Sequence, residues 1–289
     1  DGAFENVWVQ PAAGDAGGAL GAALAVHYHY GANPRRVQKG QDAMAGSYLG
    51  PQFDQDEIEG RLKALGAAFN VVDENRLVLE TAQAINEEKA VGWFQGRMEF
   101  GPRSLGGRSI LGDPRSPNMQ KTLNLKVKYR ESFRPFAPSV LADQVDQWFE
   151  FTGDSPYMLM VADVTESRRI SMNQEEQNLF GLEKLNVSRS DIPAVTHVDY
   201  SARIQTVDAE TNPRYHALIS AFHGLTGCPV LINTSFNVRG EPIVCSPEDA
   251  YRCFMGTDLD FLAIGNCILR KELQVPSNKL DYIYKFDED

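Results

Sequence analysis

Residues 90–115 read AVGWFQGRMEFGPRSLGGRSILGDPR, and this stretch decides the class of fold. Its first five residues are apolar and have the length of a buried strand. The residues that follow, 96–115, contain four arginines among five glycines. Open α/β sheets bind their ligands where strands end. Since arginine grips phosphate through paired hydrogen bonds and glycine lets backbone amides approach the same oxygens, the stretch predicts an anion site at a strand end.

The N-terminal part of the chain predicts a strand, a helix and a linker. The strand is expected over residues 7–9 and the helix over 16–30, with Asp15 as its cap. The alanines and leucines of this helix predict burial on most of its sides. Residues 31–51 carry glycine, proline and polar residues without periodicity, as a linker does.

From residue 54 onward, helix and strand patterns alternate. Asp54 and Glu57 form a capping-box pattern at the start of a helix that ends at Gly66. Thr81 is the expected cap of a helix that runs to residue 88. The dipeptide 116–117 opens another helix, with Met119, Leu123 and Val127 on one face. Strands are expected over 77–79, 90–94, 139–141, 157–164, 196–207, 230–232 and 261–269, and further helices over 213–225 and 246–255. This alternation predicts an α/β domain of roughly 230 residues.

The composition is that of a folded, acidic protein. Of the 289 residues, 43% are hydrophobic and 23% are charged, which excludes disorder of the whole chain. The net charge of -11 makes nucleic acid an unlikely partner, because like charges repel. No apolar run approaches the roughly 20 residues of a membrane-spanning helix, so no membrane partner is expected. The four cysteines, Cys228, Cys245, Cys253 and Cys267, show no CxxC spacing and are expected to be reduced and buried in a cytoplasmic protein.

One basic patch does occur, between residues 96 and 134. It holds nine basic residues against three acidic ones, and the basic residues are Arg97, Arg103, Arg108, Arg115, Lys121, Lys126, Lys128, Arg130 and Arg134. A solvated helix face is the ordinary interpretation of such a charge run. Here the cations alternate with glycine, proline, serine and phenylalanine, which favours loops folded around a small anion.

Two later segments combine flexible backbone with ligand-type side chains. Residues 124–139, NLKVKYRESFRPFAPS, place Lys128, Arg130 and Arg134 where a helix ends in a proline-bounded loop, outside the expected core. Residues 230–244, VLINTSFNVRGEPIV, form an apolar strand that ends in short hydrogen-bonding groups suited to a nucleotide. Together with residues 96–115, these segments indicate binding of a phosphorylated substrate. The chain lacks GxxxxGK[ST] and HExxH, so neither a P-loop nor that zinc site is expected.

The same segments resemble a known family. GPRSLGGRSILGDPR (101–115), YRESFRPFAPSV (129–140) and NTSFNVRGEPIV (233–244) closely resemble the C-terminal half of the O-carbamoyltransferases that modify nodulation factors, cephamycins and aminoglycosides such as tobramycin. In that family an actin-like (ASKHA) domain precedes a YrdC-like domain, and PAAGDAGGALGAA (11–23) is similar to the last motif of the first. The resemblance implies an ASKHA remnant and linker over residues 1–50, and a YrdC-like twisted mixed sheet with helices over residues 51–289.

The resemblance also implies a chemistry. The YrdC-like domain makes carbamoyl-adenylate from carbamoyl phosphate and ATP, and the ASKHA-type domain passes the carbamoyl group to a hydroxyl of a small-molecule acceptor. The matching catalytic positions are Arg103, Lys128 and Arg134. Those matched to nucleotide and carbamoyl phosphate binding are Arg97, Arg108, Asn124, Arg203, Asn233, Ser235 and Asn237.

Cofactors and partners follow from the same resemblance. Mg²⁺ is expected with ATP, and its ligands are not identified. Asp15 matches a metal ligand of the ASKHA-type domain, but the HxxxH ligands expected upstream are absent, so Fe²⁺ is expected only in the full-length protein with its N-terminal domain. A homodimer is compatible with the sequence. The alternative is a non-catalytic nucleotide- or RNA-binding module that retains the basic cavity, and the acidic net charge counts against it.

Overall fold

The computed structural model describes residues 8–36, 42–185 and 187–276. Within them, the strands are β1 (Asn70–Val71), β2 (Val91–Phe94), β3 (Arg108–Gly112), β4 (Ala137–Leu141), β5 (Met160–Asp163), β6 (Ser201–Val207), β7 (Val230–Ser235), β8 (Phe261–Ile264) and β9 (Cys267–Arg270). They form one nine-stranded sheet in the order β1-β9-β8-β2-β3-β7-β4-β6-β5. Parallel and antiparallel pairs occur side by side, so the fold is mixed α/β, as the alternating pattern predicts.

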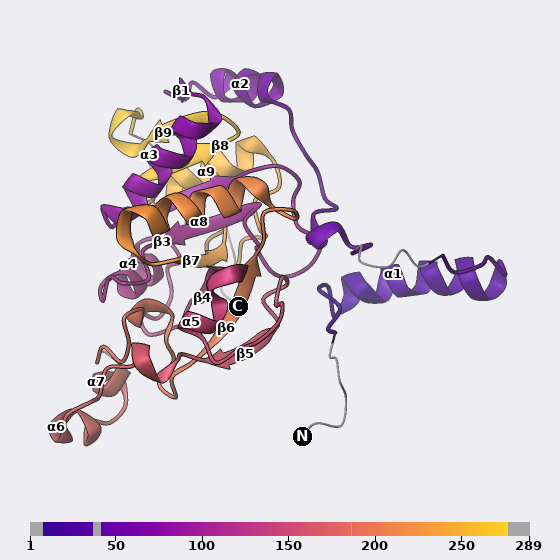
Figure 1. The fold of residues 1–289 in the computed structure, drawn as a ribbon. Coiled ribbons are helices and arrows are strands. Elements are labelled where there is room, and N and C mark those ends of the chain that lie inside the picture. Colours follow the sequence, from indigo (N-terminus) through magenta and orange to yellow (C-terminus); the bar gives the residue numbers. More distant parts are fainter. Residues whose placement is uncertain (1–7, 37–41, 186, 277–289) are drawn as a thin grey trace.

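Helices cover both faces of the sheet (Figure 1). The α-helices of the described residues are α1 (Asp15–Ala25), α2 (Gln55–Ala64), α3 (Glu74–Asn86), α4 (Met119–Lys126), α5 (Val145–Trp148), α6 (Gln174–Gln177), α7 (Leu182–Leu185), α8 (Pro213–Thr226) and α9 (Pro247–Gly256). In Figure 1, α3 and α8 lie side by side in front of the sheet, and α9 lies behind it. The central strands are therefore buried on both faces.

The strand directions decide which loops lie together. β2 is parallel to β8 and antiparallel to β3, and β3 is antiparallel to β7, so β2, β7 and β8 run the same way. β4 is antiparallel to β7 and parallel to β6, so β3, β4 and β6 run the other way. The ends of β2, β7 and β8 and the starts of β3, β4 and β6 therefore meet at one end of the sheet. We call this the Gln95 end, after the residue that follows β2.

A large apolar core joins the helices that cover the sheet to its strands, and a smaller separate cluster surrounds Leu105. Trp93, Phe222 and Phe254 are fully buried within the large core. All four cysteines lie in the described residues and none forms a disulfide. Three of them, at 228, 253 and 267, are buried, while Cys245 is half-buried. The prediction that the cysteines are buried is confirmed for these three.

Several predicted elements are confirmed. The carboxylate of Asp54 accepts the N–H of Glu57 at 2.8 Å and so caps α2, which ends before Gly66 with its φ of +69°. Helix α4 buries Met119 and Leu123 on one face, as their spacing predicts. The expected strands over 90–94, 139–141 and 230–232 correspond to β2, β4 and β7, and the last two expected helices correspond to α8 and α9.

The predicted strand over residues 77–79 is wrong, because these residues lie inside α3. Asp73 caps this helix by accepting the N–H of Arg76 at 2.9 Å. Thr81, the predicted cap, is buried within the helix and donates to the carbonyl of Leu77 at 2.6 Å. Buried positions at 77, 78, 81, 82 and 85 recur at helical spacing, and this longer pattern outweighs the short apolar run.

Other strands differ from the prediction in their limits. β5 and β6 are shorter than the expected 157–164 and 196–207. Residues 261–269 form two antiparallel strands, because Gly265, with a φ of +52°, and Asn266 make a turn between β8 and β9. β3 was not predicted: the stretch interpreted as a loop contains a strand at the centre of the sheet.

The N-terminal segment departs most from the prediction. Helix α1 projects away from the sheet and contains no buried residue, so its predicted burial is wrong for the described chain (Figure 1). Gly14 is its N-cap, and Asp15 is the first helical residue. Trp8 and Val9 belong to no strand, and residue 7 lies outside the described residues. Part of the predicted linker is packed, since Ser47 is buried and its hydroxyl donates to the carbonyl of residue 100 at 2.6 Å.

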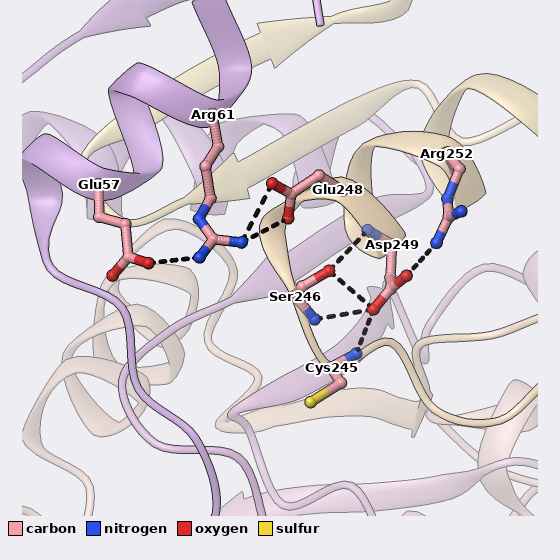
Figure 2. A network of polar contacts seen from close by, with 7 residues as sticks. All are labelled: Glu57, Arg61, Cys245, Ser246, Glu248, Asp249 and Arg252. Carbon is pink, nitrogen blue, oxygen red and sulfur yellow. Dashed lines mark hydrogen bonds and ion pairs between the residues drawn. The ribbon is translucent and has the colours of Figure 1, made fainter. Parts of the chain in front are cut away.

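A polar network joins α2 to α9 (Figure 2). One guanidinium nitrogen of Arg61 contacts both carboxylate oxygens of Glu248, at 3.1 and 3.0 Å, and another contacts Glu57. Beside it, the N–H of Asp249 donates to the Ser246 hydroxyl at 3.2 Å, and the N–H of Ser246 donates to the Asp249 carboxylate at 2.9 Å. These contacts hold the start of α9 against α2.

Asp54→Ala is expected to lower the free energy of unfolding by about 1 kcal/mol, because the first N–H groups of α2 lose their side-chain acceptor. Urea unfolding followed by circular dichroism measures the change. Asp56→Ala is the matched control, since it removes the same side chain from the same helical turn at an exposed position that does not cap. Equal losses in the two variants would show that the cap contributes nothing.

Candidate functional site

The predicted anion-site residues gather at the Gln95 end of the sheet. They come from the β2–β3 loop (Arg97, Arg103), the start of β3 (Arg108), α4 and the loop after it (Asn124, Lys128, Arg134), the first half of β6 (Arg203), and the end of β7 with the segment that follows (Asn233, Ser235, Asn237). The strand directions thus bring three segments that are distant in the sequence to one place. Asp15 is the first residue of α1, a helix that projects away from the sheet (Figure 1).

Arg103 and Arg203 are neighbouring cations. Burial lowers the pKa of Arg203 below its ordinary value, and the charge of Arg103 lowers it further. Within the described residues, neither arginine has a carboxylate partner, and the Nε atom of each is buried without a hydrogen bond. A terminal nitrogen of Arg203 approaches only the sulfur of Met158, at 4.0 Å. Because the two guanidinium groups repel each other and lack a carboxylate partner in the described residues, they have unused capacity to bind an anion such as phosphate.

Lys128 links the end of α4 to the segment after β7. Its ammonium group donates to the carbonyl and hydroxyl oxygens of Ser235, at 2.5 and 3.1 Å, and to the main-chain and side-chain oxygens of Asn237, at 2.8 and 2.6 Å. The side chain is 3% exposed, so the prediction that it lies outside the core is wrong. Protein oxygens occupy its donors, and three predicted site residues therefore contact one another directly.

Asn124 shapes the loop that carries Arg134. It is fully buried, and its amide donates to the carbonyls of Ser132 and Arg134, at 3.1 and 2.8 Å. Its side-chain oxygen accepts from Arg130 at 2.7 Å. Arg134 is exposed and pairs with Glu131 at 3.0 Å. Asn124 therefore fixes the main chain of residues 132–134. Arg134 lies at the surface, as the sequence predicts.

Arg108 is an anchor of the β2–β3 loop. It is fully buried, and its guanidinium lies 3.6 Å from the centroid of the Phe94 ring. It donates to the carbonyls of Gln95 and Gly96, at 3.1 and 3.2 Å, and to that of Pro51 at 3.2 Å. Burial lowers the pKa of Arg108 to about 10. Carbonyl oxygens and an aromatic face thus surround this cation, which leaves it facing the protein instead of a ligand.

Asn233 belongs to a buried polar layer. Its amide nitrogen lies 3.0 Å from the carbonyl of Ser104, 3.0 Å from the hydroxyl of Ser139 and 2.9 Å from the side-chain oxygen of Gln205. Its own side-chain oxygen and the Ser104 hydroxyl are buried without a partner in the described structure. Through the contact of Asn233 with Ser104, this layer attaches the β2–β3 loop to β4, β6 and β7.

Two cavities lie near the site. One of about 710 Å³ opens at the ends of β2 and β8 and is lined by Phe53, Arg97 and Asn266, among others. Arg97 is exposed there and donates to the carbonyl of residue 50 at 3.1 Å. A larger cavity of about 1070 Å³ lies between the segment around Trp8 and residues 154–160. The residues lining these two cavities do not include Arg103 or Arg203, so that pair lies in neither cavity.

Within the described residues, no ligand set for iron surrounds Asp15. Asp15 is exposed, and no group of three or more His, Cys, Asp or Glu side chains in the described ranges is placed to hold a metal ion. Ligands from outside these residues would be needed for Fe²⁺ to bind at Asp15. The ligands of Mg²⁺ likewise stay unidentified.

Sequence reasoning missed Glu99, which lies inside the stretch that opens the site. It is 6% exposed, and its Oε1 accepts the N–H groups of Leu105 and Gly107, at 2.6 and 2.8 Å. A signal was available, because an acidic residue among arginines and glycines is a natural acceptor for the amides of its own loop. The amides that the sequence argument assigned to a phosphate are therefore bound internally.

Comparison with known proteins identifies the family. The family model described as "Carbamoyltransferase C-terminus" matches residues 82–271. The chain belongs to this family, and the resemblance inferred from the three motifs is confirmed. No helix in the described part is long and apolar enough to cross a membrane.

The curated relatives are longer proteins. An uncharacterized protein of Synechocystis sp. is 60% identical over 95% of this chain and 45% of its own length. Nodulation protein NolNO of Sinorhizobium fredii is 40% identical over 96% of this chain and 38% of its own length. The chain thus spans less than half the length of these relatives. The match to full-length HypF in its phosphate- and nucleotide-bound form covers 70% of this chain and 22% of the HypF chain, at 15% sequence identity and a TM-score of 0.42. This similarity is too distant to support an inference.

The buried ammonium group of Lys128 is expected to make stability depend on pH. Burial lowers its pKa from 10.5 to about 7, and the charge of Arg130 adds to this. Between these two values the unfolded chain holds a proton that the folded chain has lost. Stability should therefore rise with pH across this window, by up to about 1.4 kcal/mol per unit.

Lys128→Met is expected to flatten that rise, which urea unfolding at pH values from about 7 to about 10 measures. Lys126→Met is the control, because Lys126 is an exposed lysine in the last turn of α4. It should keep the slope of the wild-type protein. An unchanged slope in Lys128→Met would mean that Lys128 titrates in the folded protein as it does in the unfolded chain.

Proposed function

We propose that this chain is the adenylate-forming part of an O-carbamoyltransferase and makes carbamoyl-adenylate from carbamoyl phosphate and ATP. The observation that carries the proposal is that Arg103 and Arg203 lie near enough for their charges to interact and have no carboxylate partner in the described residues. Both substrates present phosphate oxygens, which paired guanidinium groups bind well. Membership of the family supports the carbamoyl chemistry.

The reaction shifts negative charge between phosphate oxygens. Water releases inorganic phosphate from carbamoyl phosphate, and an oxygen of the resulting carbamate attacks the α-phosphorus of ATP. The new O–P bond forms while the bond to the β-phosphate oxygen breaks, and pyrophosphate leaves with the electron pair. Fixed cations stabilise the charge that builds up on the leaving group. Mg²⁺ bound to the nucleotide would supply further positive charge.

The residues at the Gln95 end have different parts in this reaction. Arg103 and Arg203 bind phosphate oxygens directly. Arg134, exposed at the rim, exchanges its contact with Glu131 for one with the bound nucleotide. Lys128 holds the 235–237 segment in place for nucleotide contacts. Positioning and charge thus do most of the work, and no general base is required of these side chains.

We further assign residues 1–50 to the end of a preceding ASKHA-type domain and residues 51–289 to the YrdC-like domain. The absence of any buried residue in the alanine- and leucine-rich α1 supports this division, because such a helix ordinarily packs against a neighbour. Transfer to a hydroxyl of a sugar or antibiotic-type acceptor then belongs to that domain. The lack of a disulfide among the described cysteines favours a cytoplasmic location.

The chain alone is expected to release pyrophosphate from ATP when carbamoyl phosphate is present, and to transfer nothing to sugar hydroxyls. A coupled pyrophosphate assay measures the first reaction, with carbamoyl phosphate omitted as the control. A folded protein that releases no pyrophosphate would contradict the proposed activity. Efficient carbamoylation of a sugar hydroxyl would contradict the division between the two domains.

Arg103→Ala and Arg134→Ala are expected to weaken carbamoyl phosphate or ATP binding by roughly ten- to a hundredfold, since each loses a charge-assisted contact of about 1.5–3 kcal/mol. Thermal melts should change little, because both substitutions relieve repulsion between cations. Calorimetric titration measures the affinities. Lys89→Ala, which removes a cation where β2 begins, at the opposite end of the sheet, should bind like the wild-type protein. Early melting with normal affinity would refute the anion site.

No iron is expected to bind through Asp15 in this chain, because a lone carboxylate supplies too few ligands for a stable transition-metal site. Metal analysis of protein incubated with Fe²⁺ and then desalted measures this directly. Asp15→Asn should give the same low iron content. Stoichiometric iron that disappears in Asp15→Asn would overturn the prediction.

A further inference from the structure

One buried carboxylate gathers the amides of the β2–β3 loop. Oε1 of Glu99 accepts the N–H groups of Leu105, Gly107 and Arg108, at 2.6, 2.8 and 3.3 Å. Successive amides that converge on one oxygen form the kind of nest in which loops bind phosphate. Here the oxygen belongs to the Glu99 side chain, so these amides are already hydrogen-bonded within the protein. Glu99 therefore determines the shape of the loop that follows Arg103.

The carbonyl groups of the same loop are also held. The carbonyl of Leu105 accepts from the hydroxyl of Tyr48 at 2.7 Å and from the amide of Gln205 at 2.9 Å. The carbonyl of Gly106 accepts from the indole of Trp93 at 2.9 Å. These donors come from the segment before α2, from β6 and from β2. Contacts on several sides leave the loop a single conformation.

Two glycines allow the close approach that these contacts need. Gly106 has a φ of +102°, and a Cβ atom there would lie 2.3 Å from the ring of Tyr215. A Cβ atom on Gly107 would lie 2.8 Å from the carbonyl oxygen of Arg97 and 3.1 Å from Oε2 of Glu99. The glycines therefore let the backbone reach the carboxylate, which is a role different from contact with a ligand.

Arg103 depends on this loop for its position. In the described structure its side chain makes no hydrogen bond or ion pair, and its neighbour Arg203 carries the same charge. Repulsion would separate the two guanidinium groups if the main chain were free to move. A rigid loop keeps the pair together before a ligand binds, so less ordering is needed at binding.

We propose that Glu99 is a positioning residue of the phosphate site. Its carboxylate fixes the β2–β3 loop so that Arg103 stays beside Arg203 in the absence of ligand. The inference rests on the proposed function for the identity of the substrates, but its structural content concerns any phosphate that binds this pair. Inorganic pyrophosphate is therefore a suitable probe.

The test compares two buried carboxylates at opposite ends of β3. Glu99→Gln keeps the shape and removes the charge, and Asp113→Asn does the same at a side chain that is 2% exposed and pairs with Arg115 at 2.6 Å. Both variants are expected to melt earlier than the wild-type protein. Glu99→Gln alone should lose hydrogen-exchange protection at residues 105–108. It alone should weaken pyrophosphate binding, by roughly tenfold, as charge-assisted bonds become neutral ones.

Further variants keep the outcomes distinct. Arg103→Ala defines how much pyrophosphate binding depends on the pair, and wild-type protein without such binding would overturn the proposal. Equal affinities in Glu99→Gln and Asp113→Asn would also overturn it. If Glu99→Gln fails to fold, Glu99→Asp, which keeps the charge but shortens the reach, should show reduced affinity, and wild-type affinity there would count against the role. If Glu99→Gln weakens pyrophosphate binding while the wild-type protein does not turn over ATP and carbamoyl phosphate, the positioning role of Glu99 would be supported and the proposed reaction refuted.

Discussion

The Gln95 end of the sheet depends on one constraint, the gathering of cations where few carboxylates can neutralise them. The chain as a whole is acidic, yet residues 96–134 hold nine basic residues against three acidic ones. The partners of the buried basic side chains are neutral oxygens: Arg108 binds main-chain carbonyls, and Lys128 binds oxygens of Ser235 and Asn237. Neutral acceptors replace water without cancelling the charge. Positive potential therefore persists at this end and is available to an anion.

The position of β3 makes this gathering possible. β3 lies between β2 and β7 and is antiparallel to both, so the chain returns to the sheet directly after the β2–β3 loop. Antiparallel neighbours need only a short connection, whereas a parallel neighbour needs a crossover. The loop consequently stays at the end of the sheet, where the 124–139 and 230–244 segments also arrive. A helix inserted between β2 and β3 would have carried the arginines away from it.

The sequence predicts those features that a local pattern determines. Asp54 caps α2, and the apolar spacing of α4 is correct, because both depend on residues within a few positions of each other. Residues 77–79 and β3 are predicted wrongly, since a short apolar run and an arginine–glycine stretch each allow more than one local structure. The gathering of the site segments is predicted, but the burial of Lys128 is not. Its acceptors lie 107 and 109 positions away, so its environment is decided by strand order.

The arginines of the stretch 96–115 differ in burial, and this difference separates them into two groups although the residue type is the same. Arg108 is fully enclosed by carbonyls and an aromatic ring, so removal of its side chain would leave buried acceptors without donors, which is costly. Arg103, five positions earlier, is partly exposed and faces another arginine, so its removal relieves repulsion. A buried cation such as Arg108 therefore stabilises the structure of the site, whereas a cation such as Arg103 can bind a ligand. Glu99 connects the two, because its carboxylate binds the main chain of Arg108 and, through the same loop, sets the position of Arg103.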